Sequence, residues 1–97
     1  MPVVAVFQHP TLTRETYEAS IRELTGGRAR VDQPSDWPVK GLLVHVAGET
    51  GSGFRVIDVW ASEEAYREFG EVLGPIMAKL GLGGQPQVYQ VHTLVSA

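Results

Sequence analysis

The segment 41-GLLVHVAGETGSGFRVIDVW-60 predicts a β-hairpin, because two alternating runs flank the short turn 50-TGSG-53. Successive side chains of a strand point to opposite faces, so parity sorts each run into two sets. The first set is plain hydrocarbon apart from one arginine, and it contains Leu42, Val44, Val46, Arg55, Ile57 and Val59. The opposite set mixes apolar and polar side chains, and it contains Leu43, His45, Ala47, Phe54, Val56, Asp58 and Trp60. An apolar face that carries hydrogen-bonding groups is typical of a ligand pocket.

The length of the turn sets the pairing of the two strands. A four-residue loop at 50–53 places Glu49 opposite Phe54 and, further along, His45 opposite Asp58. Directly opposed residues of antiparallel strands share a face and lie in contact. We therefore expect the imidazole and the carboxylate to be cross-strand neighbours.

The rest of the chain supplies two helices and two more strands. A strand is expected over Val3–Gln8, and a helix follows Thr13, which is a favoured N-cap residue, and ends at 26-GG-27. Ser62 is expected to cap a second helix, which Gly74-Pro75 should kink or split. A last strand from about Gln87 to Val95 would place Gln90 and His92 on the polar face.

The resulting order β-α-β-β-α-β is the ferredoxin-like pattern, an α+β fold in which two helices cover one face of an antiparallel sheet. The whole chain, 1–97, is expected to form a single domain. We expect the helices to cover the plain apolar set and to leave the polar set bare. A bare apolar face usually marks an interface, so two such sheets would pack together as a homodimer, a dimeric α/β barrel.

Composition excludes several classes of function. The net charge is −3 with no basic cluster, which argues against nucleic-acid binding. The absence of cysteine removes disulfides, thiolate nucleophiles and cysteine metal sites. The N-terminus does not resemble a signal peptide, and no apolar run reaches the roughly 18 residues that span a membrane. A cytoplasmic protein without membrane contact is the expectation.

The segments 56-VIDVWASEEAYREF-69 and 88-VYQVH-92, together with the element order, resemble the antibiotic-biosynthesis monooxygenase family of dimeric α/β-barrel proteins. This resemblance implies oxidation of an aromatic, polyketide-like molecule by dioxygen without metal or flavin, and a related branch binds haem. The family's catalytic tryptophan corresponds to Trp60. Asp58 lies near the place of the family's asparagine, and no arginine lies on the expected pocket face.

The candidate site residues follow from these patterns. His45 and Asp58 would form a carboxylate–imidazole pair able to act as a general base, or else a hydrogen-bonded buried pair without catalytic role. His92 is a second candidate base, and with Gln90 it could hold a substrate oxygen or an interface hydrogen bond. Trp60 offers a stacking surface for an aromatic ligand or else packs in the core, and Phe7 and Phe54 are expected as pocket walls. Trp37 is expected as a lid or, preferably, a dimer contact.

Three functions remain open at this point. The first is a cofactor-independent monooxygenase, in which the deprotonated substrate reacts with dioxygen. The second is a non-oxidative cyclase or isomerase that uses the same base, and the third is a binding or dimerisation module. No cofactor is expected, although His45, His92 and Asp58 form a conceivable two-histidine, one-carboxylate metal set, and a single histidine could bind haem.

Overall fold

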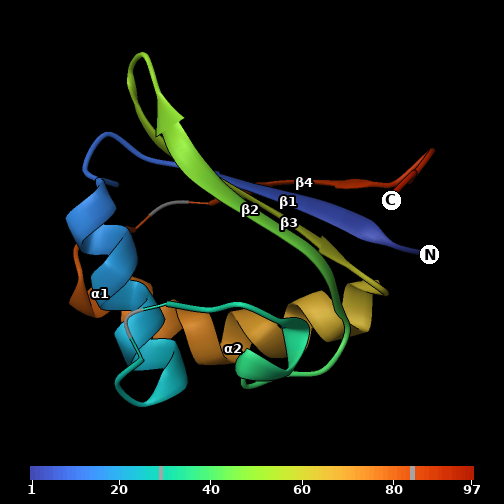
Figure 1. Cartoon of the computed structure of the whole chain (residues 1–97), viewed down its shortest axis with the longest axis horizontal. Coiled ribbons are helices and arrows are strands. Elements are labelled where there is room, and N and C mark those ends of the chain that lie inside the picture. The colour runs from blue at the N-terminus through green and yellow to red at the C-terminus, as the bar shows by residue number, and fades with distance from the viewer. Residues whose placement is uncertain (29, 84) are drawn as a thin grey trace.

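Four antiparallel strands form one sheet that lies over two helices in the computed structural model, which describes residues 1–28, 30–83 and 85–97 (Figure 1). The strands are β1 (Val3–Gln8), β2 (Leu42–Thr50), β3 (Gly53–Trp60) and β4 (Gln87–Gln90), in the spatial order β2-β3-β1-β4. The helices are α1 (Arg14–Thr25) and α2 (Glu63–Lys79), and a short 3₁₀ turn, η1, covers Pro34–Asp36. The arrangement is α+β and compatible with a ferredoxin-like fold.

Both helices begin at the residues that the sequence indicates. The Thr13 hydroxyl accepts a hydrogen bond from the Thr16 N–H, and the Ser62 hydroxyl accepts one from the Ala65 N–H. Gly26 ends α1 in the left-handed conformation, with φ of 74°. Of the kink or split expected at Gly74-Pro75, the split is wrong, because α2 continues through Pro75 to Lys79. Packing of the α2 stripe beneath the sheet outweighs the one backbone hydrogen bond that proline removes.

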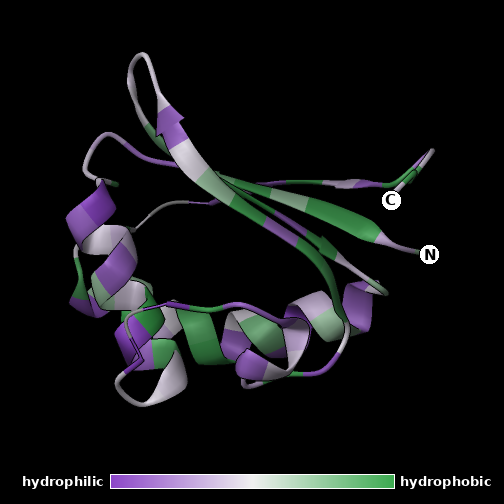
Figure 2. Ribbon diagram, viewed as in Figure 1, coloured by the Kyte–Doolittle hydropathy of each residue, from purple (hydrophilic) through white to green (hydrophobic). Residues whose placement is uncertain are grey.

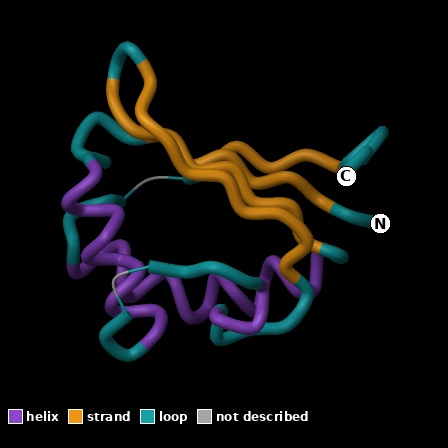
Figure 3. Tube along the Cα trace, in the orientation of Figure 1, coloured by secondary structure: helices purple, strands orange, loops and turns teal. Residues whose placement is uncertain are grey.

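The helices cover the opposite sheet face from the one expected, which is a correction to the sequence analysis. The inner face, which lies against α1 and α2, carries Phe54, Val56, Asp58 and Trp60 of β3, and these side chains are buried. The other face, here called the outer face, carries the apolar set of Val4, Val6, Val44, Val46, Ile57 and Val59. Figure 2 shows this sheet with hydrophobic stretches along its strands, and Figure 3 shows every helix on one side of it. The aromatic residues of the mixed set supply more core volume than the β-branched set, so the mixed set is the one that folding buries.

Leu42 is also placed differently from the expectation. The pairing of β2 with β3 shifts between Leu42 and Val44, so that Leu42 pairs with Trp60 and Val44 with Val59. This β-bulge at Leu43 turns Leu42 toward the helices, where it packs with Val3, Trp60 and Phe69. Simple alternation therefore fails at the first residue of β2.

The chain enters β2 through a glycine that has no space for a side chain. Gly41 has φ of 109°, and a Cβ built on it would lie 2.7 Å from the Ala65 Cβ on α2. The Gly41 carbonyl accepts a hydrogen bond of 2.8 Å from the Ala61 N–H, which ties the start of β2 to the start of α2. This contact closes one end of the space between sheet and helices.

Strand β4 is shorter than expected. It ends at Gln90 rather than Val95, and its four residues are exposed at the edge of the sheet beside β1. The Val91 N–H still donates to the Pro2 carbonyl at 2.9 Å, after which the chain leaves the sheet. His92 consequently lies beyond the strand.

Candidate functional site

A continuous chain of hydrogen bonds links α1, β2 and β3 on the inner face. The His45 Nδ1 lies 2.6 Å from the Asp58 Oδ1, and the His45 Nε2 lies 2.7 Å from the Tyr17 hydroxyl. The cross-strand register places His45 directly opposite Asp58, as the hairpin turn predicts. We call Tyr17, His45 and Asp58 the relay.

The donor and acceptor capacities of the three groups fix the direction of these hydrogen bonds. The Asp58 side chain is 3% exposed and the His45 side chain 14% exposed, so neither is freely solvated. A carboxylate only accepts hydrogen bonds, so Nδ1 of the imidazole donates to Asp58. In the neutral ring Nε2 is then the acceptor, and the Tyr17 hydroxyl donates to it.

Tyr17 keeps its proton over the whole physiological range. Burial of the ring, followed by the nearby Asp58 charge, raises the pKa of Tyr17 to about 12. The same two causes raise the pKa of Tyr66 on α2. Tyr17 is therefore a hydrogen-bond donor in the resting protein and can pass a proton onward only as it receives another.

Aromatic rings enclose the relay. The Tyr17 ring lies 5.1 Å from the Phe54 ring and 5.9 Å from the His45 ring, to which it is nearly parallel. Trp37, from the loop between α1 and β2, meets His45 edge to face with ring centroids 4.6 Å apart. The imidazole is thus held between two aromatic side chains as well as by two hydrogen bonds.

Two hollows border the relay, and a further pocket adjoins the inner one. An inner cavity of about 40 Å³ lies between sheet and helices, and its wall includes Tyr17, Trp37, His45 and Asp58. A lateral pocket of about 510 Å³ lies beside it and includes Tyr66, with His9, Gln8 and Gln85 as polar lining residues. Five apolar residues line both spaces, namely Phe7, Leu12, Leu73, Met77 and Leu82.

The third hollow opens on the other side of the relay. This groove of about 680 Å³ runs along α1 and the hairpin, and its lining includes Arg14, Glu18 and Glu49. Tyr17, Ile21 and His45 line both the groove and the inner cavity. Tyr17 and His45 therefore separate a nearly apolar interior from a charged, solvent-filled groove.

The structure distributes the other residues singled out in the sequence over several places. Phe7 lines the inner cavity and the lateral pocket, and Phe54 packs against Tyr17 in the core beside the groove. Trp60 has no exposed surface and stacks on Phe69 at 4.7 Å. Its indole Nε1 finds no hydrogen-bond acceptor within the described residues. The structure thus places Trp60 in the core, and its ring is not open to stack on a ligand.

The two residues expected near the C-terminus lie apart from the relay. Gln90, on the edge strand, donates to the Glu63 side chain at 3.2 Å. His45 is on β2 and His92 follows β4, and these strands form opposite edges of the sheet. Because β4 ends at Gln90, His92 does not take up the strand face that was expected for it. The early end of β4 leaves His92 exposed beyond the sheet. Over residues 1–28, 30–83 and 85–97, no three His, Cys, Asp or Glu side chains are grouped as a metal site.

Tyr17 is the site residue that the sequence analysis missed. Its position in the stripe with Ile21 and Leu24 indicates that it faces the sheet, and the structure bears this out. No pattern in the sequence shows which strand residue the hydroxyl would meet, because that contact depends on how α1 crosses the hairpin. Trp37 packs against His45 of its own chain.

Comparisons with known proteins add no further assignment: the chain matches no family model, no curated protein and no solved structure. In the part of the chain that the structure describes, none of the helices is both long and apolar enough to cross a membrane.

Proposed function

We propose that the protein is a cofactor-independent monooxygenase that deprotonates an aromatic, polyketide-like small molecule through the Tyr17–His45–Asp58 relay. The observation that carries this proposal is the unbroken hydrogen-bond chain at the wall of an apolar cavity. Such a chain has the parts of a general base: an imidazole, a carboxylate that orients it, and a hydroxyl that extends its reach.

The size of the hollows indicates how a substrate would bind. The inner cavity is too small for an aromatic ring, whereas the lateral pocket lies in the size range of small-molecule sites. The body of the substrate would occupy the lateral pocket between β1 and α2, with its acidic edge directed between Phe7 and Met77. Met77 is flexible enough to move aside for this edge.

Proton removal would pass through Tyr17. Both ring nitrogens of His45 are already hydrogen-bonded, so a substrate proton moves to the Tyr17 oxygen while the Tyr17 proton moves to Nε2. The imidazolium that forms is held by the Asp58 carboxylate. Tyr17 is neutral before and after this transfer, so its raised pKa is no obstacle.

The oxidative step would use the electrons of the substrate itself. The substrate carbanion adds to dioxygen to form a C–O bond, and the relay returns its proton to the resulting peroxide. Removal of the second proton from the same carbon breaks the O–O bond, giving a carbonyl and water. In sum, one CH₂ group and one O₂ become one C=O group and one H₂O, with no external reductant.

Turnover measurements test the relay. With a hydroxylated tricyclic substrate of the anthrone type, oxygen uptake by the metal-stripped protein should exceed the uncatalysed rate. His45→Gln should lower kcat by about 10²- to 10⁴-fold, the usual contribution of a general base. Tyr17→Phe should also lower kcat, because it removes the only hydroxyl that reaches Nε2 within the described residues.

Two comparisons make this test specific. Asp32→Asn removes an exposed carboxylate whose ion-pair partner is Arg28 and not a relay residue, and it should leave oxygen uptake unchanged. His92→Gln examines the residue that the sequence offered as a second base, and unchanged uptake is expected because His92 lies beyond β4. Full activity in the folded His45→Gln protein would refute the relay as the base.

The same geometry supports a second candidate function. A proton relay with no redox group fits a cyclase or isomerase equally well, and anaerobic conversion of the substrate would favour that function. If substrate binds without conversion under either atmosphere, the protein is a binding module instead.

We also propose that the protein acts as a homodimer that buries the outer sheet face, in the manner of a dimeric α/β barrel. Val46 and Tyr89 are each 55% exposed, and Tyr89 shares the outer face with Val4, its partner in the β1–β4 ladder. An apolar sheet face of this kind is usually covered in solution. This dimer leaves the relay and the lateral pocket within each protomer.

A further inference from the structure

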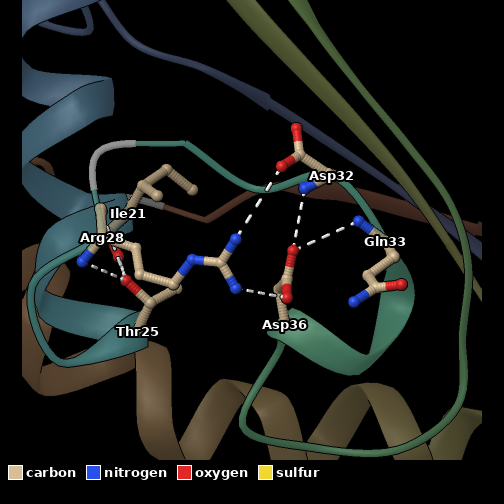
Figure 4. Close-up of polar contacts among 6 residues, drawn as sticks. All are labelled: Ile21, Thr25, Arg28, Asp32, Gln33 and Asp36. Atoms are coloured by element: carbon tan, nitrogen blue, oxygen red, sulfur yellow. Dashed lines mark hydrogen bonds and ion pairs between the residues drawn. The ribbon is translucent and has the colours of Figure 1, made fainter.

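The loop between α1 and β2 is fastened by a cluster of polar contacts that centres on Asp36 (Figure 4). Its Oδ1 accepts a hydrogen bond of 2.6 Å from the Arg28 guanidinium. Its Oδ2 accepts from the backbone N–H groups of Asp32 and Gln33, at 2.8 and 3.2 Å. The Asp36 side chain thus joins the η1 turn to Arg28 near the start of the loop and to Asp32 and Gln33 in its middle.

The cluster is tied to the last turn of α1. The Arg28 N–H donates to the Thr25 hydroxyl at 3.0 Å, and that hydroxyl donates to the Ile21 carbonyl at 2.7 Å. Ile21 is one of the residues that line the inner cavity. The loop is therefore anchored to the same helix that carries Tyr17.

Asp36 is held in its ionised form. Its side chain is 4% exposed because the atoms of its own loop close around it near the protein surface. The Asp32 N–H is the main cause that lowers the pKa of Asp36, with smaller contributions from Gln33 and Arg28. Charge-assisted hydrogen bonds of this kind are stronger than neutral ones.

The residue after Asp36 is Trp37, whose ring lies against His45 and lines the inner cavity. The backbone N–H of Trp37 donates to the Pro34 carbonyl at 3.1 Å, which completes the short η1 turn. The Asp36 cluster therefore fixes the backbone segment from which the Trp37 side chain extends. The indole itself packs against the buried core and against His45.

We propose that Asp36 is a positioning residue for His45: it holds the Trp37 indole against the imidazole and so shields the relay from solvent on the side of the inner cavity. The inference rests on the proposed function only for its effect on turnover. The placement of Trp37 and the shielding of His45 can be measured without any substrate.

Asp36→Asn in the full chain tests the proposal, with two readouts that a merely structural role would not move together. Acrylamide quenching of tryptophan fluorescence reports mainly on Trp37, because Trp60, the other tryptophan, has no exposed surface. We expect the quenching constant to rise by about twofold or more as the loop opens locally. The His45 Nδ1 proton, followed by NMR, should exchange with solvent faster in the same variant.

Asp32→Asn is the matched control. It makes the same chemical change in the same loop, on a carboxylate that also faces Arg28, but at 3.8 Å and with a side chain 76% exposed. Quenching and proton exchange in this control should equal those of the unmodified protein. An equal rise in both variants would show a general charge effect and overturn the proposal.

The remaining outcomes are also decisive. Unchanged quenching and exchange in a folded Asp36→Asn protein would overturn the positioning role. If that variant does not fold, Arg28→Gln removes the ion pair but keeps both backbone hydrogen bonds, and it should give a smaller rise in both readouts. No rise in Arg28→Gln would then count against the proposal. Absence of turnover in the unmodified protein would affect the proposed function and leave these two measurements valid.

Discussion

The relay concentrates unusual chemistry in three side chains, each supplied by a different element. The imidazole lies between a carboxylate at 2.6 Å and a phenol at 2.7 Å, and aromatic rings cover it on two sides. Buried polar groups of this kind must be paired, and each partner here satisfies the next. Removing Asp58 would leave a buried histidine without its acceptor, so we expect variants at this position to lose stability as well as turnover.

Tyr17 gives a prediction at alkaline pH. Its folded-state pKa of about 12 exceeds the ordinary tyrosine value of 10.0, so the folded protein favours the neutral phenol. The stability from this preference is fully present below about pH 10 and is lost as the pH rises through 12. Because the ring is only half buried, we expect a loss on the order of 1 kcal/mol, discounted for screening.

Ultraviolet titration of the phenolate checks this expectation. Tyr17→Phe should remove a component that ionises near pH 12, and its urea-unfolding free energy should fall less between pH 9 and 11 than that of the unmodified protein. Tyr89→Phe, at an exposed position, should keep the component near pH 12. If the Tyr17→Phe protein kept the whole component near pH 12, the burial of Tyr17 beside Asp58 would be contradicted.

The pairing of His45 with Asp58 could be predicted because it depends only on strand parity and the length of one turn. The contact of Tyr17 with His45 could not, because it depends on the crossing of α1 over the hairpin. Trp60 shows a third case. The strand residues that share a face with Trp60 were predicted correctly from alternation. Its burial against Phe69 depends on which face of the sheet the helices cover, and alternation does not contain that information.

At the scale of elements, the approach of β2 to α2 depends on a single glycine. The bounds of β1, β3 and α1 and the start of α2 follow from caps, turns and propensity, so they were predicted closely. The bulge at Leu43 and the short β4 were not, because both depend on how an edge strand fits its neighbour. Gly41 combines a left-handed backbone with a helix at contact distance, and both constraints act at the start of β2.

Gly41→Ala should therefore destabilise the protein strongly, by about 2 kcal/mol or more, through strain and overlap with Ala65. Gly48→Ala is the matched control in the same strand, where a new Cβ meets nothing within 4 Å, and its cost should be well below that of Gly41→Ala. Urea unfolding measures both free energies. The double variant Gly41→Ala, Ala65→Gly should recover part of the loss, since it removes the overlap but keeps the strained φ. Equal effects at Gly41 and Gly48 would contradict the close approach.

At the scale of the whole molecule, the sheet separates two kinds of surface. The helices lie on one side of the sheet (Figure 1), and the relay and the inner cavity lie between them and the sheet. The apolar set of the outer face remains on the other side. The fold was predicted to present its polar-studded face to a partner copy, whereas the structure makes the plain apolar face available. A homodimer on that face would leave the relay enclosed by its own chain.

Val46→Asp tests this dimer. Light scattering after size exclusion should give twice the chain mass for the unmodified protein and a single chain mass for the variant, because a carboxylate would be buried without a partner. Val72→Asp places the same charge on the exposed surface of α2 and should remain dimeric. A monomeric unmodified protein at all concentrations would rule out the dimer, and a dimeric Val46→Asp protein would move the interface elsewhere.

The cross-strand pair of His45 and Asp58 also has a consequence for how the chain folds. A slip of the β2–β3 hairpin by one residue would send Asp58 to the opposite face and leave His45 in the interior without its hydrogen-bond acceptor. An apolar pair at these positions would tolerate such a slip far better, since hydrocarbon contacts are not directional. The two groups proposed to move protons in the mature protein therefore also favour the correct hairpin register during folding, because a misaligned hairpin is penalised once the helices pack over it.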